Sequence, residues 1–236
     1  MTSVRIIGPG RAGTSLHHAL RRAHWPVEPL LGRGDDLRDA TRGVDLVVIA
    51  TPDATVPDVA AAITPSDEVV VAHLSGSLGL GPLAAHRRVA VLHPLVALPD
   101  PDRGADRLVG AWFGLATDGD ALVEEVVEEL HGRVVRVAEE DWARYHAAAV
   151  VASNHLVALL GQVERIASAA GVPLEAYLDL ARGALDDVTA LGPAAALTGP
   201  VRRGDAATVE GHLAALPPEE RPAYEALARE AARLCP

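Results

Sequence analysis

The first part of the chain alternates short apolar runs, rich in β-branched residues, with amphipathic stretches. This alternation predicts parallel strands joined by crossover helices. The runs are almost wholly apolar, as in strands covered on both faces. The predicted strands are Val4–Ile7, Leu30–Leu31 with its neighbours, Leu46–Ala50, Val69–Ala72, Val89–Leu92, Trp112–Ala116 and Val134–Val137. Pro29 lies in the second run and has no N–H for a central ladder, so we expect that strand to be short.

After Val137 the sequence has only helical periodicity. Negative charge at residues 139–141 favours the start of a helix, and Gly171 followed by Pro173 favours its end. The helix would hold about 32 residues and be roughly 48 Å long. Its middle is apolar nearly all round, so we expect other helices, of this chain or of a second subunit, to cover it. Further helices are predicted near Leu174–Leu191, Asp205–Leu216 and Glu219–Leu234, with Asp205 as an N-cap.

The change of pattern predicts two domains. Residues 1–137 would form an α/β domain with a parallel sheet, and residues 138–236 an all-helical domain. The helical domain has more apolar surface than its own helices can cover, which favours a homodimer formed through it.

Composition excludes several classes of function. The 21 basic residues face 32 acidic ones, a net charge of −11 with no basic patch, so we expect no nucleic-acid partner. His, Asn or Pro interrupts the longest apolar stretches, so we expect no membrane span. The single cysteine, Cys235, allows neither a disulfide framework nor a cysteine-based metal site, and no metal is expected. With no export signal before the first strand, we expect a cytoplasmic protein.

The chain contains no lysine, so every basic residue is an arginine. A Schiff-base lysine, a phosphate-loop lysine and a lysine general acid are therefore all excluded. The richness in Ala, Arg and Gly is typical of a GC-rich genome, which explains the missing lysine without a functional cause.

The most specific motif lies at residues 6–13, Ile-Ile-Gly-Pro-Gly-Arg-Ala-Gly, between the first strand and the first helix. Gly8, Gly10 and Gly13 would allow a tight turn, close approach of a pyrophosphate and packing of the helix on the strand. The helix N-terminus, with Arg11 and Ala12, would face the phosphates. The motif predicts a Rossmann-type dinucleotide-binding domain.

The end of the second predicted strand bears on the choice of dinucleotide. Enzymes that use NAD commonly have an acidic side chain there, for the ribose 2′-hydroxyl. This chain has Arg33 instead, whose guanidinium suits a 2′-phosphate, so NADP is favoured over NAD. The alternative is that Arg33 is solvated and that Asp35 or Asp36 supplies the acid.

Polar residues also follow the next strand. Thr51, Pro52 and Asp53 lie at the carboxyl edge of the predicted sheet, where ligands of open α/β sheets bind. They would contact the cofactor, or they form an ordinary turn in which Asp53 caps a helix.

Two histidines follow apolar runs and are predicted at the same edge, His73 and His93. A histidine near its ordinary pKa of about 6.5 could supply the proton that reduction of a carbonyl or imine requires. Ser75 or Ser77 could hold the tautomer of such a ring. The alternative is that these histidines are structural, for example one that caps the turn before Pro94.

The helical domain offers further candidates. Asn154 is predicted on a packed stripe of the long helix, where its amide needs partners, either a ligand or a neighbouring helix. His146 precedes it on the same helix and is a candidate for substrate binding. Arg202 and Arg203 lie in a predicted loop and could bind an anionic substrate, or they pair with surface carboxylates.

The chain resembles a known family in a series of motifs: Gly-Pro-Gly-Arg-Ala-Gly, Thr-Pro-Asp, His-Leu-Ser-Gly, His-Pro-Leu, Tyr-His-Ala-Ala-Ala-Val-Val-Ala-Ser-Asn, and Ala-Leu-Thr-Gly-Pro with Arg-Gly-Asp. It resembles the bacterial NADP oxidoreductases that pair a Rossmann-like domain with a small helical domain of unknown function. The resemblance spans essentially the whole chain. More distantly, the chain is similar to pyrroline-5-carboxylate reductase, ketopantoate reductase and prephenate dehydrogenase.

The resemblance implies a Rossmann domain, a helical dimerisation domain and a cleft between them. Prephenate dehydrogenases have a catalytic His before Pro, which His93-Pro94 matches, and a serine that would correspond to Ser75 or Ser77. Ketopantoate reductases rely on a lysine that this chain lacks. Two classes of function follow: an NADPH-dependent reductase of a small carbonyl or imine carboxylic acid, or a dinucleotide-binding sensor or scaffold without turnover.

Overall fold

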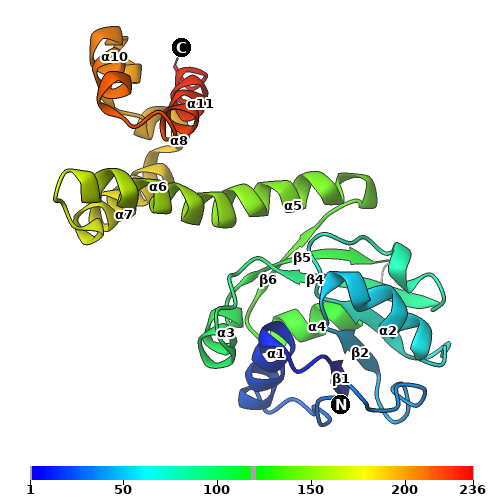
Figure 1. Ribbon diagram of the computed structural model, residues 1–236. Helices are drawn as coiled ribbons and strands as arrows, with labels where there is room; N and C mark the ends of the chain where they lie inside the picture. Colours follow the sequence, from blue (N-terminus) through cyan, green and yellow to red (C-terminus); the bar gives the residue numbers. More distant parts are fainter. Residues whose placement is uncertain (1, 118–120, 236) are drawn as a thin grey trace. The chain divides into compact units, whose positions relative to one another are not determined.

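The computed structural model describes residues 2–117 and 121–235 (Figure 1). Contacts divide the chain into two compact units, Met1–Ser153 and Asn154–Pro236. The predicted domain boundary at residue 138 follows the last strand of the sheet, and as a statement about domains it stays a prediction.

The first unit is built on a sheet of six strands within the described residues. The strands are β1 (Val4–Ile7), β2 (Leu46–Ile49), β3 (Val70–His73), β4 (Arg88–Pro94), β5 (Trp112–Thr117) and β6 (Arg133–Arg136). They lie side by side in chain order, and β1 to β4 are parallel, as are β5 and β6. The predicted α/β class is confirmed, with a mostly parallel sheet followed by helices.

One pairing differs from the all-parallel prediction, because β5 runs antiparallel to β4. The chain leaves β4 after Pro94, passes through α3 (Pro101–Leu108) and re-enters the sheet at Trp112. The Leu95 N–H donates to the Trp112 carbonyl oxygen, so the connection starts and ends at the same edge of the sheet. Without a crossover to the far edge, the new strand must run in the opposite direction.

The predicted strand at Leu30–Leu31 is also not an ordinary strand. Its segment lies along the free edge of β1 through two isolated parallel bridges, Val4 with Val27 and Ile7 with Leu31. Pro29 lies between the two bridges and has no N–H to continue a ladder.

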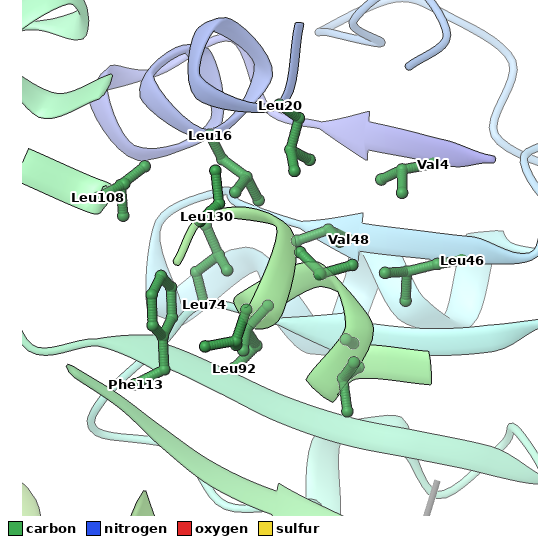
Figure 2. Packing of buried hydrophobic residues seen from close by; sticks show 14 of the residues in the cluster. Val4, Leu16, Leu20, Leu46, Val48, Leu74, Leu92, Leu108, Phe113 and Leu130 are labelled. Carbon is green, nitrogen blue, oxygen red and sulfur yellow. The ribbon is translucent and has the colours of Figure 1, made fainter. Parts of the chain in front are cut away.

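Helices cover both faces of the sheet. The helices α1 (Arg11–Arg22), α3 and α4 (Leu122–Glu129) pack on one face around the cluster of buried side chains in Figure 2, which includes Leu16, Leu92 and Phe113. On the other face α2 (Val56–Ala62) and the short 3-10 helix η2 (Gly81–Leu83) bury a second cluster.

The side chains of β4 alternate between these faces. Ala90 and Leu92 belong to the first cluster, whereas Val91 packs with Trp142 at the start of α5 (Trp142–Val150). Because strand side chains have a period of two, His93 projects to the same face as Val91, where α5 begins.

The described residues of the second unit form helices joined by short connections, with no strand among them. Its elements are α6 (Leu156–Ala169), α7 (Leu174–Leu191), α8 (Pro193–Ala196), α9 (Gly199–Arg203), α10 (Ala206–Ala215) and α11 (Arg221–Ala232). The three helices predicted after the long one are confirmed, and Asp205 caps α10 by accepting the Thr208 N–H. The predicted loop that carries Arg202 and Arg203 is wrong, because Gly199–Arg203 forms α9 and ends at Gly204 with φ +68°.

The long helix is confirmed, with a change of winding in its middle. It spans Glu139–Ala169 and contains a π-helical segment, η4 (Val151–His155). By length and composition this one described helix could cross a membrane, and its apolar window is almost entirely unburied. Val151 and Val157 are more than half exposed. The expected covering of this helix, by this chain or by a second subunit, stays a prediction.

Candidate functional site

The glycine turn between β1 and α1 has the geometry that the motif predicts. Gly8 has a φ of +112°, and a Cβ on it would lie 2.7 Å from the Ala50 carbonyl oxygen. A Cβ on Gly13 would lie 2.0 Å from the Gly8 carbonyl oxygen. The fold itself therefore requires these two glycines. A Cβ on Gly10 would meet nothing within 4 Å, so the space beside Gly10 is open.

The N-terminus of α1 presents unpaired donors to this space. Its N-cap, Gly10, has no side chain to cap the helix, and the first turn has no acidic residue. The N–H groups of Arg11, Ala12 and Gly13 belong to the first turn of α1, so no carbonyl oxygen within the helix accepts them. Beside the turn, the Thr51 hydroxyl is buried without a hydrogen-bond partner among the described residues. These backbone N–H donors and the unpaired Thr51 hydroxyl together fit a phosphate group.

The loop after Leu31 packs against this turn. A Cβ on Gly32 would lie 3.2 Å from the Pro9 side chain, so Gly32 and the glycine turn are in contact. The next residue, Arg33, is exposed, and within residues 2–117 and 121–235 its guanidinium has neither an ion pair nor a hydrogen bond. The structure thus places a free cation beside the turn.

Both alternative acids in this loop already have partners. The Asp35 carboxylate accepts the Gly32 N–H at 2.7 Å. The Asp36 carboxylate pairs with Arg38 at 2.6 Å, and hydrogen bonds from Arg38 lower the pKa of Asp36 to about 2. This arrangement favours Arg33, rather than an acid, as the group that meets the ribose.

Asp53 links the end of β2 to the turn after β3. It begins the 3-10 helix η1 (Asp53–Thr55) but does not cap it, and its carboxylate instead accepts the Ser77 hydroxyl at 2.5 Å. Ser75 lies next in the chain of hydroxyls, 3.2 Å from Ser77, and also accepts the N–H groups of residues 77 and 78. Neither hydroxyl is hydrogen-bonded to a histidine, in contrast to the expectation that one would hold its tautomer.

His73 is fully buried, and the backbone occupies both ring nitrogens. Its Nε2 lies 3.0 Å from the Gly79 carbonyl oxygen, and its Nδ1 accepts the Ser75 N–H at 3.2 Å. Burial lowers the pKa of His73, so the ring is neutral at neutral pH. With no ring atom left for a substrate, the geometry favours a structural role.

His93 lies near the end of β4 with its two ring nitrogens in different surroundings. Its Nδ1 lies 2.8 Å from the Tyr145 hydroxyl oxygen of α5. Its Nε2 has no hydrogen-bond partner among the described residues and is not sealed from solvent. The His146 ring packs edge-on at 5.8 Å. A Cβ on Gly76 would lie 2.6 Å from both His93 Nε2 and His146 Cδ2, so the missing side chain of Gly76 makes room for both rings.

The electrostatics of His93 differ from the expectation of an ordinary titrating histidine. Burial, reinforced by His146, lowers the pKa of His93 to about 4, while the Asp53 carboxylate acts in the opposite direction. The ring is therefore neutral at neutral pH. It can donate a hydrogen bond from one nitrogen and accept one at the other, but it does not carry a spare proton.

Sequence reasoning missed Tyr145. The phenol occupies the space above Gly114, where a Cβ would lie 2.1 Å from its hydroxyl oxygen, and Gly114 is the register partner of His93 on β5. Burial raises the pKa of Tyr145 to about 12, so its hydroxyl keeps its proton. A glycine opposite the histidine in an antiparallel pair was the available signal, but it required the pairing of β4 with β5, which was predicted as parallel.

The remaining candidates lie in the second unit. Asn154 falls in the π-helical segment η4 and is exposed within this single chain, so its place on a stripe packed by other helices stays a prediction. Arg202 and Arg203 are exposed in the last turn of α9, with no ion pair or hydrogen bond to any described residue. Their roles toward a substrate stay predictions.

Among residues 2–117 and 121–235, no group of three or more His, Cys, Asp or Glu side chains is placed to hold a metal ion.

Comparisons with known proteins agree with the fold. Residues 113–231 match the family described as a domain of unknown function, DUF2520. A Bacteroides fragilis protein, BF3122, provisionally named an NADP oxidoreductase, is 21% identical with a TM-score of 0.82, and 98% of each chain is covered. Protein TM1727 from Thermotoga maritima is 24% identical with a TM-score of 0.75, covering 98% of this chain and 97% of that one.

A third solved structure has a ligand. A reductive aminase from Aspergillus terreus, in complex with NADPH and ethyl levulinate, is 18% identical with a TM-score of 0.73, covering 99% of this chain and 94% of that chain. No curated protein matches the chain in sequence.

Proposed function

The chain belongs to the DUF2520 family, and on that premise we propose that it is an NADPH-dependent oxidoreductase that reduces a small carbonyl or imine carboxylic acid, such as a keto acid. Two solved structures of the same fold are named as an NADP oxidoreductase and as a reductive aminase in complex with NADPH. At this low sequence identity, the likeness to these structures shows only the fold. The function has to be argued from the residues of this chain.

The residues around the glycine turn fit the cofactor. The open space at Gly10, the free N–H groups at the start of α1 and the orphaned Thr51 hydroxyl would hold its pyrophosphate. The unpaired Arg33 would bind a 2′-phosphate. When bound, the reduced nicotinamide supplies the hydride.

The observation that carries the proposal is the open Nε2 of His93. The ring is neutral, and its Nδ1 is hydrogen-bonded to Tyr145. Its Nε2, near the carboxyl edge of the sheet, remains available to a ligand. A positioned donor of this kind can meet negative charge as it develops on a carbonyl oxygen. His146, whose ring packs on His93, would border the bound substrate.

The acidic substrate is inferred from the free arginines of α9. Arg202 and Arg203 make no hydrogen bond and no close ion pair with any described residue, although the chain carries an excess of acidic side chains and Arg203 acts on Asp205 at longer range. Guanidinium groups recognise carboxylates through paired hydrogen bonds. Asn154 would supply an amide for orienting the same substrate.

The assembly and compartment are part of the proposal. The exposed apolar residues of the long helix and of α7 fit a homodimer formed through the helical unit. A single cysteine fits a reducing compartment, the cytoplasm.

Binding of NADPH tests the cofactor part of the proposal. Gly10→Ala places a methyl where the protein leaves open space, so we expect the fold to be kept and NADPH binding, measured by calorimetry, to weaken at least about tenfold. Gly81→Ala is the matched control, because a Cβ there also meets nothing within 4 Å. If both variants bind NADPH as the wild type does, the glycine turn is not the cofactor site.

Turnover tests the chemical part. Oxidation of NADPH would be followed with 2-keto acids, cyclic imines and prephenate-like compounds. His93→Asn should lower kcat by at least about a hundredfold while NADPH still binds. A loss confined to KM would assign His93 to uniform substrate binding. Binding of NADPH without turnover of any compound would favour a dinucleotide-binding sensor.

A further inference from the structure

Tyr145 determines which nitrogen of His93 carries the proton. Its hydroxyl oxygen lies 2.8 Å from His93 Nδ1. A backbone hydrogen bond from Gly114 lowers the pKa of Tyr145, so Gly114 acts on the phenolic oxygen as a donor. No second acceptor for the phenolic proton is found among residues 2–117 and 121–235. If Nδ1 carried the proton and donated it, the phenolic hydrogen would have no acceptor in a half-buried position. The satisfied arrangement has Tyr145 donating to Nδ1, which leaves the ring proton on Nε2, the open nitrogen.

From this geometry we propose that Tyr145 is the source of the proton for reduction of a carbonyl, and that His93 relays it as a neutral ring. The proposal rests on the proposed reductase function and extends it, because it assigns the proton to a residue of α5 and favours a C=O acceptor over an iminium ion. An iminium nitrogen already carries its proton and needs no donor.

The step balances in atoms and charge. When the carbonyl carbon accepts hydride from the reduced dinucleotide, the C=O π electrons move to the oxygen, which takes the proton from His93 Nε2. The ring in turn takes the phenolic proton at Nδ1, so it stays neutral with its tautomer reversed and Tyr145 becomes a phenolate. After the alcohol leaves, water returns a proton to the open Nε2, and Nδ1 gives its proton back to the phenolate.

The surroundings favour this route over a charged histidine. The titratable and charged groups that act on His93 are His146, Asp53, His73 and Tyr145. Burial lowers the pKa of His93 to about 4 and raises that of Tyr145 to about 12, so at neutral pH the tyrosine holds the only proton of the pair that can be spared. An alkoxide is a stronger base than a phenolate, so transfer from Tyr145 is downhill.

The helical unit supplies a matched control. His212 Nδ1 lies 2.7 Å from the Tyr224 hydroxyl oxygen, with the rings edge to face, as in the His93 pair. The hydrogen bond of that pair is exposed, and the pair plays no part in the proposed reaction. Tyr224→Phe therefore removes an equivalent hydrogen bond elsewhere in the same chain.

The first test is the tautomer, and it needs no substrate. In the full chain with 15N-labelled histidine, two-bond NMR correlations at pH 7 should show His93 neutral with its proton on Nε2, assigned by its absence in His93→Asn. Tyr145→Phe should abolish this preference, and Tyr224→Phe should alter only His212. A proton on Nδ1 in the wild type, or an unchanged His93 tautomer in Tyr145→Phe, overturns the relay.

The second test separates the proton source from the positioning of the ring. With a 2-keto acid, Tyr145→Phe should lower kcat at least about tenfold with little change in KM. With a preformed cyclic iminium substrate, kcat should change less than about twofold, and Tyr224→Phe should match the wild type with both substrates. Equal losses on both substrates would overturn Tyr145 as the proton source. If the wild type binds NADPH but turns over no carbonyl, the proposed function fails, whatever the tautomer.

Discussion

Tyr145 fills the space that a side chain at Gly114 would occupy: a Cβ on residue 114 would lie 2.1 Å from the Tyr145 hydroxyl oxygen. This distance is far below van der Waals contact. The Tyr145 hydroxyl is also hydrogen-bonded to His93, and His93 is the register partner of Gly114 in the pairing of β4 with β5. The fit between strand and helix is therefore what holds the tyrosine on the histidine.

Gly114→Ala tests this fit. The added methyl must push Tyr145 away, so we expect a loss of about 1–3 kcal/mol in the free energy of unfolding, as in other overpacked cores. The NMR signal of His93 should also lose its tautomer preference. Gly183→Ala in α7 is the control, since a Cβ there meets nothing within 4 Å and alanine favours a helix. Equal stability of the two variants in urea titrations would contradict the packing described above.

Arg33 should decide the choice of dinucleotide. Arg33→Ala removes a guanidinium that has no partner among the described residues, so its loss should leave the fold unchanged. We expect NADPH binding to weaken by at least about 1.5 kcal/mol, the scale of a charge-assisted hydrogen bond, and NADH binding to stay nearly the same. Arg38→Ala, which removes an exposed arginine of the same loop, is the control. Equal losses for both dinucleotides would defeat the assignment.

The sequence predicted those parts of the fold that depend on local patterning. Apolar runs and glycine spacing located the six strands and the turn at Gly8, and α7 spans the predicted residues, Leu174–Leu191. The direction of β5 was not predictable in the same way, because it depends on where α3 returns the chain to the sheet. Pairing across a sheet is a non-local property that strand patterning does not encode.

The candidate site likewise has features that local sequence predicts and features that depend on non-local contacts. The pattern placed His93 near the end of a strand but could not give its pKa, which depends on burial under α5. Tyr145 was passed over because it is distant in sequence from His93. His73 is equally prominent in the sequence, but both of its ring nitrogens are hydrogen-bonded to backbone, one to the Gly79 carbonyl oxygen and one to the Ser75 N–H. These contacts depend on the turn after β3, which the sequence pattern does not give.

The apolar surface of the helical unit predicts self-association. Val157, Leu180 and Leu191 are 60% or more exposed. Burying such side chains against a second copy would contribute roughly 1.5–3 kcal/mol for each one fully buried. We expect a dimer in sedimentation at micromolar concentration, and Val157→Glu should shift it toward monomer. A wild-type monomer would contradict this, and a wild type that sediments with lipid vesicles would assign the long helix to a membrane instead.

The lowered pKa of His93 predicts how stability depends on pH. In the unfolded chain a histidine titrates near 6.5, whereas in the folded chain the pKa of His93 is about 4. Between these values the unfolded state binds more protons than the folded state. The free energy of unfolding is therefore not reduced by His93 above about pH 6.5, and it falls as the pH falls toward 4. His73, also lowered, acts in the same direction.

The measurement is a series of urea titrations from pH 7.5 to pH 4, compared between the wild type and His93→Asn. Over this window the wild type should lose more stability than the variant, by on the order of 2 kcal/mol once partial contact of the ring with water is allowed for. His24→Asn, at an exposed histidine whose φ of 59° asparagine tolerates, controls for loss of a histidine. Because carboxyl groups titrate alike in all three proteins, the difference between the curves isolates His93. Parallel curves for the wild type and His93→Asn would mean that the ring is not held neutral, and the relay from Tyr145 would lose its electrostatic support.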